Sequence, residues 1–104
     1  MRHIVVGMGE IGTALYQCLM MNGHAPGRVD IESAYASGPS EYLHICIPGT
    51  LPEFLDVVAG YIEEYGPRVC IIHSTVNPGT TDALQEMVRR YVAYSPVRGR
   101  HGHS

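Results

Sequence analysis

The sequence predicts an α/β fold in which helices cover both faces of a parallel sheet. Short runs of β-branched and apolar residues alternate along the chain with longer segments whose apolar residues recur at helical spacing. Right-handed connections between the strands then favour the strand order 2-1-3-4-5. The chain has 104 residues, 45% of them hydrophobic, which is enough for one domain with a core.

The first half of the chain begins with an expected strand at 3–6 and a helix at 10–21. The helix is predicted from one apolar face, formed by Ile11, Ala14, Leu15, Cys18 and Leu19. Asn22-Gly23 is a typical helix end. A short strand is expected at 28–31, and the segment at 33–41 is too short and too broken by glycine and proline for a full crossover helix.

The second half begins with a strand at 42–47, followed by a helix that ends at Gly66-Pro67. Thr50 and Glu53 match the N-cap and N3 positions of a capping box, which predicts the start of this helix. The remaining expected elements are a strand at 69–73, a helix whose apolar stripe lies between 84 and 91, and a strand at 91–94.

The strongest functional signal is the stretch from Gly7 to Gly12, which has the pattern G-x-G-x-x-G between a strand and a helix. In a dinucleotide-binding turn, Gly7 permits the tight bend, Gly9 lets the backbone approach a pyrophosphate, and Gly12 lets the helix pack against the strand. The free N–H groups at the helix start would face the anion. The alternative is a glycine-rich turn that binds nothing.

Asp30 lies about twenty residues beyond the glycines, where a ribose-binding acid is found in such folds. Its carboxylate would accept hydrogen bonds from the ribose hydroxyls, and together with Glu32 it would repel a 2′-phosphate. This favours NAD over NADP as the cofactor. The alternative is a solvated acid at the end of a strand.

Composition excludes several classes of protein. A net charge of -3 gives no reason to expect nucleic acid as a partner, and no apolar run is long enough to span a membrane. The start of the chain shows no signal peptide, and Cys18, Cys46 and Cys70 form no C-x-x-C pair. They are interpreted as buried, reduced thiols of a cytoplasmic protein. Residues 1–95 are assigned to one domain and 96–104 to a polar tail.

Three loops are expected to meet at one edge of the sheet. In a sheet of this order the ligand lies outside the carboxyl ends of the first and third strands, where the strand order reverses. The loops that converge there are 7–12, 46–50 and 73–79. This convergence predicts the position of a binding site.

Four segments together resemble the nucleotide-binding half of the UDP-glucose/GDP-mannose dehydrogenases, within the wider 6-phosphogluconate and 3-hydroxyacid dehydrogenase group. The segments are Gly7-Met8-Gly9-Glu10-Ile11-Gly12, Gly23-His24 with Val29-Asp30-Ile31-Glu32, Ile45-Cys46-Ile47-Pro48, and Ser74-Thr75-Val76-Asn77-Pro78-Gly79-Thr80-Thr81. The last is the most specific. The match covers most of residues 1–95, although the segment between Asp30 and Tyr42 is much shorter than in the family.

The resemblance implies a compact Rossmann-like domain that binds NAD. The residues expected to bind the cofactor are Gly7, Met8, Gly9, Glu10, Ile11, Gly12, Asp30, Cys46, Ile47, Pro48, Ser74 and Thr75. Catalysis does not carry over, because those enzymes use a later substrate domain and a glutamate that Val97 replaces here. We expect the isolated chain to be inactive.

Other candidate catalytic groups have simpler interpretations. His73 ends a buried strand, where a histidine is more often structural than a proton shuttle. Cys46 has no neighbour in the sequence that would lower its pKa, so it is assigned to the core. His101 and His103 lie in a polar terminus without a third ligand, and no metal site is predicted.

Three functions remain open from the sequence. The chain could be the cofactor domain of a dehydrogenase, a non-enzymatic NAD(H)-binding or sensing module, or a structural protein that has lost the ligand. Its strands are continuous apolar runs, so both faces of the sheet should be buried. Because the first helix alone covers one face, the last three strands are left bare there. This predicts a homodimer or a complex with a separate catalytic subunit.

Overall fold

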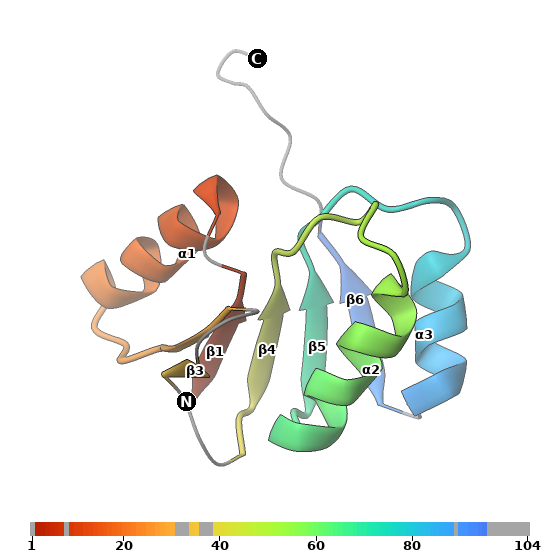
Figure 1. Cartoon of the computed structure of the whole chain (residues 1–104). Coiled ribbons are helices and arrows are strands. Elements are labelled where there is room, and N and C mark those ends of the chain that lie inside the picture. The colour runs from red at the N-terminus through yellow and green to blue at the C-terminus, as the bar shows by residue number, and fades with distance from the viewer. Residues whose placement is uncertain (1, 8, 31–33, 36–38, 89, 96–104) are drawn as a thin grey trace.

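The computed structural model describes residues 2–7, 9–30, 34–35, 39–88 and 90–95. One sheet carries helices on its two sides (Figure 1). Its strands are β1 (His3–Val6), β2 (Gly27–Val29), β3 (Ala34–Tyr35), β4 (Tyr42–Ile45), β5 (Val69–Ile72) and β6 (Tyr91–Tyr94). The helices are α1 (Glu10–Met21), α2 (Phe54–Tyr65) and α3 (Thr80–Val88). The predicted tail at 96–104 lies outside the described residues.

The sheet confirms the predicted strand order. The parallel strands lie in the order β2-β1-β4-β5-β6, which is 2-1-3-4-5 when they are numbered among themselves. The segment at 33–41 contains no crossover helix in its described part, as expected. It does contain β3, which was not predicted from the sequence and which pairs antiparallel with β2 at the sheet edge. The order reverses between β1 and β4, so the edge beyond these two strands is where a site is expected.

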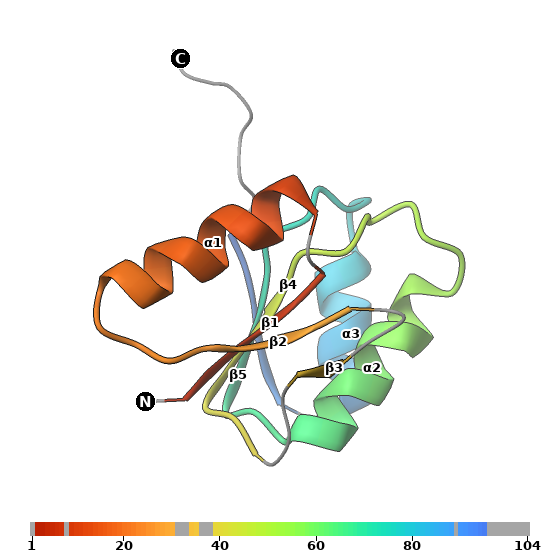
Figure 2. The same ribbon diagram turned by 60° about the vertical axis from the view of Figure 1, so that its left-hand side comes forward.

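The helices lie on opposite sides of the sheet, as the right-handed connections predict. Figure 2 shows α1 on one side and α2 with α3 on the other. The main core lies between the sheet and the pair α2 and α3. It contains Ile4, Val6, Val29, Leu43, Ile45, Phe54, Val58, Ile62, Cys70, Ile72 and Leu84, all of them buried. Alternate residues of each strand thus form a continuous apolar layer.

The opposite face of the sheet is less well covered, as expected for the last three strands. Val5, His44, Ile71 and Ala93 lie side by side across four strands on this face. Val5 and His44 are buried, but Ile71 and Ala93 are only half-buried. The continuous apolar run of β5 therefore does not bury both faces within this chain.

The capping box predicted at Thr50 and Glu53 does not form. Helix α2 begins at Phe54, and Glu53 is its N-cap residue in the left-handed conformation, with φ 60° and no side-chain cap hydrogen bond. The preceding residues form tight turns instead, because the Leu51 N–H bonds to the Pro48 carbonyl and the Phe54 N–H to that of Leu51. These turns place the loop after β4 against the loop after β5.

Smaller differences concern strand ends and one thiol. The strands predicted to reach Ile47 and His73 end at Ile45 and Ile72, and the strand predicted at 28–31 is β2. Cys70 is buried and Cys46 half-buried, but Cys18 is exposed on α1, contrary to expectation. No helix in the described ranges is long and apolar enough to cross a membrane.

A glutamine covers the outer edge of β6. The Ser95 N–H bonds to the Ile72 carbonyl of β5. Successive residues of a strand direct their N–H and C=O groups to opposite edges, so the backbone groups of Val92 and Tyr94 point away from β5. Oε1 of Gln85 accepts the outward N–H of Val92 at 2.8 Å, and its Nε2 donates to the Arg90 carbonyl. The Gln85 amide thus takes the place of a neighbouring strand, which protects an edge that could otherwise pair with another chain.

We predict that Gln85→Ala lowers the free energy of unfolding by about 1–2 kcal/mol, because Val92 and Arg90 lose their partners at a half-covered edge. Urea unfolding followed by circular dichroism measures this. Gln17→Ala, at an exposed position of α1, is the matched control and should change stability by less than about 0.5 kcal/mol. Equal urea midpoints for the two variants would show that the hydrogen bonds of the Gln85 amide contribute nothing to stability.

Candidate functional site

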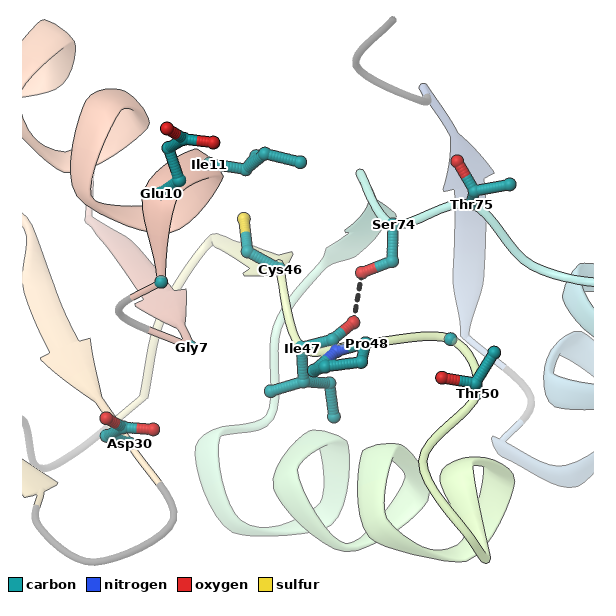
Figure 3. Close-up of a pocket in the computed structure, with 12 residues that line it drawn as sticks. Gly7, Glu10, Ile11, Asp30, Cys46, Ile47, Pro48, Thr50, Ser74 and Thr75 are labelled. Atoms are coloured by element: carbon teal, nitrogen blue, oxygen red, sulfur yellow. Dashed lines mark hydrogen bonds between the residues drawn. The ribbon is translucent and has the colours of Figure 1, made fainter. Parts of the chain in front are cut away.

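A cavity of about 510 Å³ lies at the carboxyl ends of β1 and β4, where the strand order reverses. It is lined by Gly7, Gly9, Glu10, Ile11, Asp30, Cys46, Ile47, Pro48, Gly49, Thr50, Ser74 and Thr75. Figure 3 shows these residues coming from α1, the end of β2 and the loops after β4 and β5. Of the described residues predicted to bind a cofactor, all but Gly12 line this cavity. Met8 lies outside the described residues.

Gly7 and Gly12 bring α1 close to the end of β1. Gly7 has a φ of 97°, and a Cβ there would come within 2.9 Å of the Cys46 backbone, so both its conformation and its space require glycine. A Cβ at Gly12 would lie 1.7 Å from the Gly7 carbonyl oxygen. Gly12 therefore serves helix–strand packing, as predicted, and does not face the cavity.

Gly9 opens the start of α1 toward the cavity. It is the N-cap residue of α1 and supplies no side-chain hydrogen bond, and its carbonyl accepts the first helical bond, from the Thr13 N–H. The N-cap glycine thus leaves the backbone N–H groups of the first turn without a side-chain cap. A Cβ at Gly9 would meet nothing within 4 Å, so the space beside it is open. This arrangement suits an anion.

Asp30 and Thr75 lie at opposite ends of the cavity (Figure 3). Asp30 follows β2 directly and is exposed. Its charge is felt by Tyr61 of α2, whose pKa is raised by burial and also by the carboxylates of Asp30 and Glu64. An elongated ligand could therefore meet a carboxylate at one end and a hydroxyl at the other, with the N–H groups of α1 between them.

The loops after β4 and β5 are tied together by Ser74. Its hydroxyl is buried and donates to the Ile47 carbonyl, so this predicted site residue positions the loops as well as lining the cavity. A Cβ at Gly49 would lie 2.2 Å from the Thr75 carbonyl oxygen, which shows how closely the loops approach. Gly49 and Thr50 also line the cavity and were missed. The turn signal Pro48-Gly49 marked their loop but gave no role to single residues.

Cys46 faces the cavity but is a poor nucleophile. Burial raises the pKa of its thiol to about 11, and a protonated thiol does not attack. This agrees with the expectation that Cys46 is no nucleophile, but its half-buried position at the cavity differs from its assignment to the core. Among the residues that the structure describes, no group of three or more histidine, cysteine, aspartate or glutamate side chains could hold a metal ion. His101 and His103 lie outside the described residues.

Three histidines form a hydrogen-bonded chain across the sheet, on the face that carries α1. Nδ1 of His3 lies 2.9 Å from Nε2 of His44, and Nδ1 of His44 lies 3.0 Å from Nε2 of His73. The rings of neighbouring members are stacked, and Nδ1 of His73 lies 3.2 Å from the Ser95 carbonyl oxygen. We call this chain the histidine ladder. It runs diagonally from the start of β1 to the end of β5.

The carbonyl at the end of the ladder fixes every tautomer. A carbonyl only accepts, so Nδ1 of His73 must carry the proton and its Nε2 must accept. Nδ1 of His44 then donates to His73, and Nδ1 of His3 donates to His44. Both nitrogens of His73 are thus engaged in structural bonds. These bonds, and the absence of His73 from the cavity lining, agree with the structural interpretation made from the sequence.

Comparison of the sequence with known protein families and with curated proteins finds no match. Among solved structures, the chain resembles a reductive aminase from Aspergillus terreus in complex with NADPH and ethyl levulinate. The TM-score is 0.63 at 17% sequence identity, over 89% of this chain and 39% of the aminase chain. The chain thus spans well under half the length of that protein. The likeness shows that it has a Rossmann-like fold.

We predict that the histidine ladder makes the fold sensitive to acid. Burial, with the neighbouring His73 and His3, lowers the pKa of His44 to about 4. The unfolded chain therefore binds this proton more tightly, so the contribution is full above pH 6.5 and is lost as the pH falls toward 4. Between pH 7.5 and 5.0, His44 alone should cost about 2 kcal/mol of unfolding free energy.

Urea unfolding at a series of pH values tests this prediction. His44→Phe is the comparison, because it removes the titrating ring while filling the same space. Its stability is expected to be lower at neutral pH, since His73 and His3 lose a partner, but to change less with pH. If parent and variant show the same slope against pH, His44 is not the group responsible.

Proposed function

We propose that this chain binds a nicotinamide dinucleotide in the cavity beyond β1 and β4, and that the preferred cofactor is NAD(H). The observation that carries this is the open start of α1 at the reversal of strand order, with Gly9 leaving room beside unshielded N–H groups. A pyrophosphate at this place would put one ribose near Asp30 and the other nucleoside near Thr75. The reductive aminase of similar fold, solved with NADPH, supports a cofactor of this class.

The choice of NAD(H) rests on charge at the end of β2. Asp30 lines the cavity, and a carboxylate there accepts from two ribose hydroxyls but repels a 2′-phosphate. Arg28 lies two residues earlier on β2, and its guanidinium carbon lies 5.8 Å from the ring centroid of Tyr16. In that position it is directed at α1. The proposal therefore assigns the selectivity to Asp30.

We further propose that the chain is a dehydrogenase-type cofactor domain and does not turn over substrate by itself. The S-T-V-N-P-G-T-T segment at 74–81 supports descent from nucleotide-sugar dehydrogenases. Of the two candidate catalytic groups, Cys46 lines the cavity and His73 is not among its lining residues. Cys46 holds its proton, and both nitrogens of His73 are bonded. A catalytic group would then come from another chain or segment.

The first test of cofactor binding is Gly9→Val. The backbone at Gly9, with φ -73°, accepts a side chain, and a Cβ there meets nothing in the protein, so the variant should fold. Its methyl groups would occupy the space proposed for the pyrophosphate and should weaken NADH binding by at least about tenfold in calorimetric titration. Gly60→Val, at an equally open glycine on α2, is the control. Unchanged NADH affinity in folded Gly9→Val would falsify the site.

The second test concerns selectivity. Asp30→Ala should weaken NADH by about 1–3 kcal/mol, the cost of losing charge-assisted hydrogen bonds, and should bring NADH and NADPH closer in affinity. Asp82→Ala removes an exposed carboxylate from the first turn of α3, away from the cavity, and should leave both affinities unchanged. Tighter binding of NADPH than NADH by the parent chain would overturn the assignment.

A further inference from the structure

The face of the sheet that carries α1 is covered over only part of its width. Helix α1 packs at the end of β1, and Tyr16 reaches Arg28 of β2, whereas no described helix covers β4, β5 and β6 on this side (Figure 1). We call the side chains that these strands present there the floor. The floor consists of Tyr42, His44, Val69, Ile71, His73, Tyr91 and Ala93.

The floor has the sequence of a covered surface. Val69-Cys70-Ile71-Ile72 is an uninterrupted apolar run, the pattern of a strand buried on both faces. In this chain its residues are alternately half-exposed and buried, and Tyr91 beside them is 66% exposed. The composition of β5 therefore matches a sheet with a further layer over the floor.

The composition of helix α1 also does not match its burial. Glu10 is its one charged residue among twelve, yet Gly12 is its one buried residue. Ala14 and Met21 lie on the side opposite Gly12, and Met21 is 87% exposed. Apolar side chains exposed in this way on a mostly apolar helix are normally covered by a further layer. We call this outer side of α1, formed by Glu10, Ala14, Gln17 and Met21, the ridge.

We propose that a second copy of this chain covers the floor, with the two α1 helices packed side by side between two sheets. A two-fold axis along the strands would place the ridge of each chain on the floor of the other. Each α1 then fills the place over its partner's sheet where no helix lies in the single chain. The same patch serves both subunits, which is how closed dimers avoid further growth.

The charges favour a second copy over a different partner. A two-fold interface brings a surface against itself, so like charges would repel. The floor contains no aspartate, glutamate, lysine or arginine, and the ridge carries one charge, Glu10, at its end. Pairing through the edge of β6 is the other route to a dimer, and the Gln85 amide obstructs it.

The dimensions fit a small interface. A helix of twelve residues is ~18 Å long, and a floor of three strands is ~14 Å wide and ~13 Å high. Such a contact lies at the low end of specific interfaces, which bury roughly 600–1,000 Å² on each partner. We therefore expect dissociation constants in the micromolar range.

Sedimentation equilibrium of the full chain at micromolar concentrations tests the proposal. The parent should show reversible association between 11.4 kDa and twice that mass. Ala14→Glu on the ridge and Ala93→Arg on the floor should each weaken self-association on the order of 100-fold, because each buries an unpaired charge twice in the dimer. Gly60→Arg adds the same charge to the exposed side of α2 and should associate like the parent.

A mixture of Ala14→Glu and Ala93→Arg distinguishes ridge-on-floor packing from other arrangements. In the mixed dimer one half of the interface is unaltered and the other places glutamate against arginine, so association should return. A monomeric parent, or variants that associate as the parent does, would overturn the proposal. Ala14 is exposed, so its variant should keep the parent's circular dichroism and decides the matter even if Ala93→Arg fails to fold.

Discussion

The close approach of α1 to the end of β1 is the constraint on which the rest of the structure depends. A Cβ at Gly12 would lie 1.7 Å from the Gly7 carbonyl oxygen and 3.4 Å from Cβ of Cys46, so the helix rests directly on backbone. This contact directs the first turn of α1 at the carboxyl edge of the sheet. It also sets the distance between α1 and the loop after β4, and hence the width of the cavity.

The elements that could be predicted from the sequence are those that a local pattern of residues determines. β1, α1 and β6 have the predicted bounds because a strand run, an apolar helical face and a terminal strand each show in consecutive residues. The strand order followed from the handedness of the connections, which is nearly invariant. The cavity followed in turn, since that order determines which loops meet.

The features that could not be predicted from the sequence are those that depend on contacts between residues far apart in the chain. β3 has two residues and exists through pairing with β2, so it has no periodicity to detect. The capping box does not form because residues 48–54 make successive turns and Glu53 takes the left-handed conformation just before α2 begins. The histidine ladder depends on the register that offsets His3, His44 and His73 by a fixed step on successive strands. No spacing along the chain reveals that register.

The histidine ladder also has a consequence for how this sequence can change over evolution. Because the Ser95 carbonyl dictates the tautomer of each ring in turn, replacing the middle ring strands a donor on one side and an acceptor on the other. The three positions are therefore energetically coupled, and the cost of changing two of them differs from the sum of the separate costs. Related sequences should therefore either keep all three histidines or replace all three.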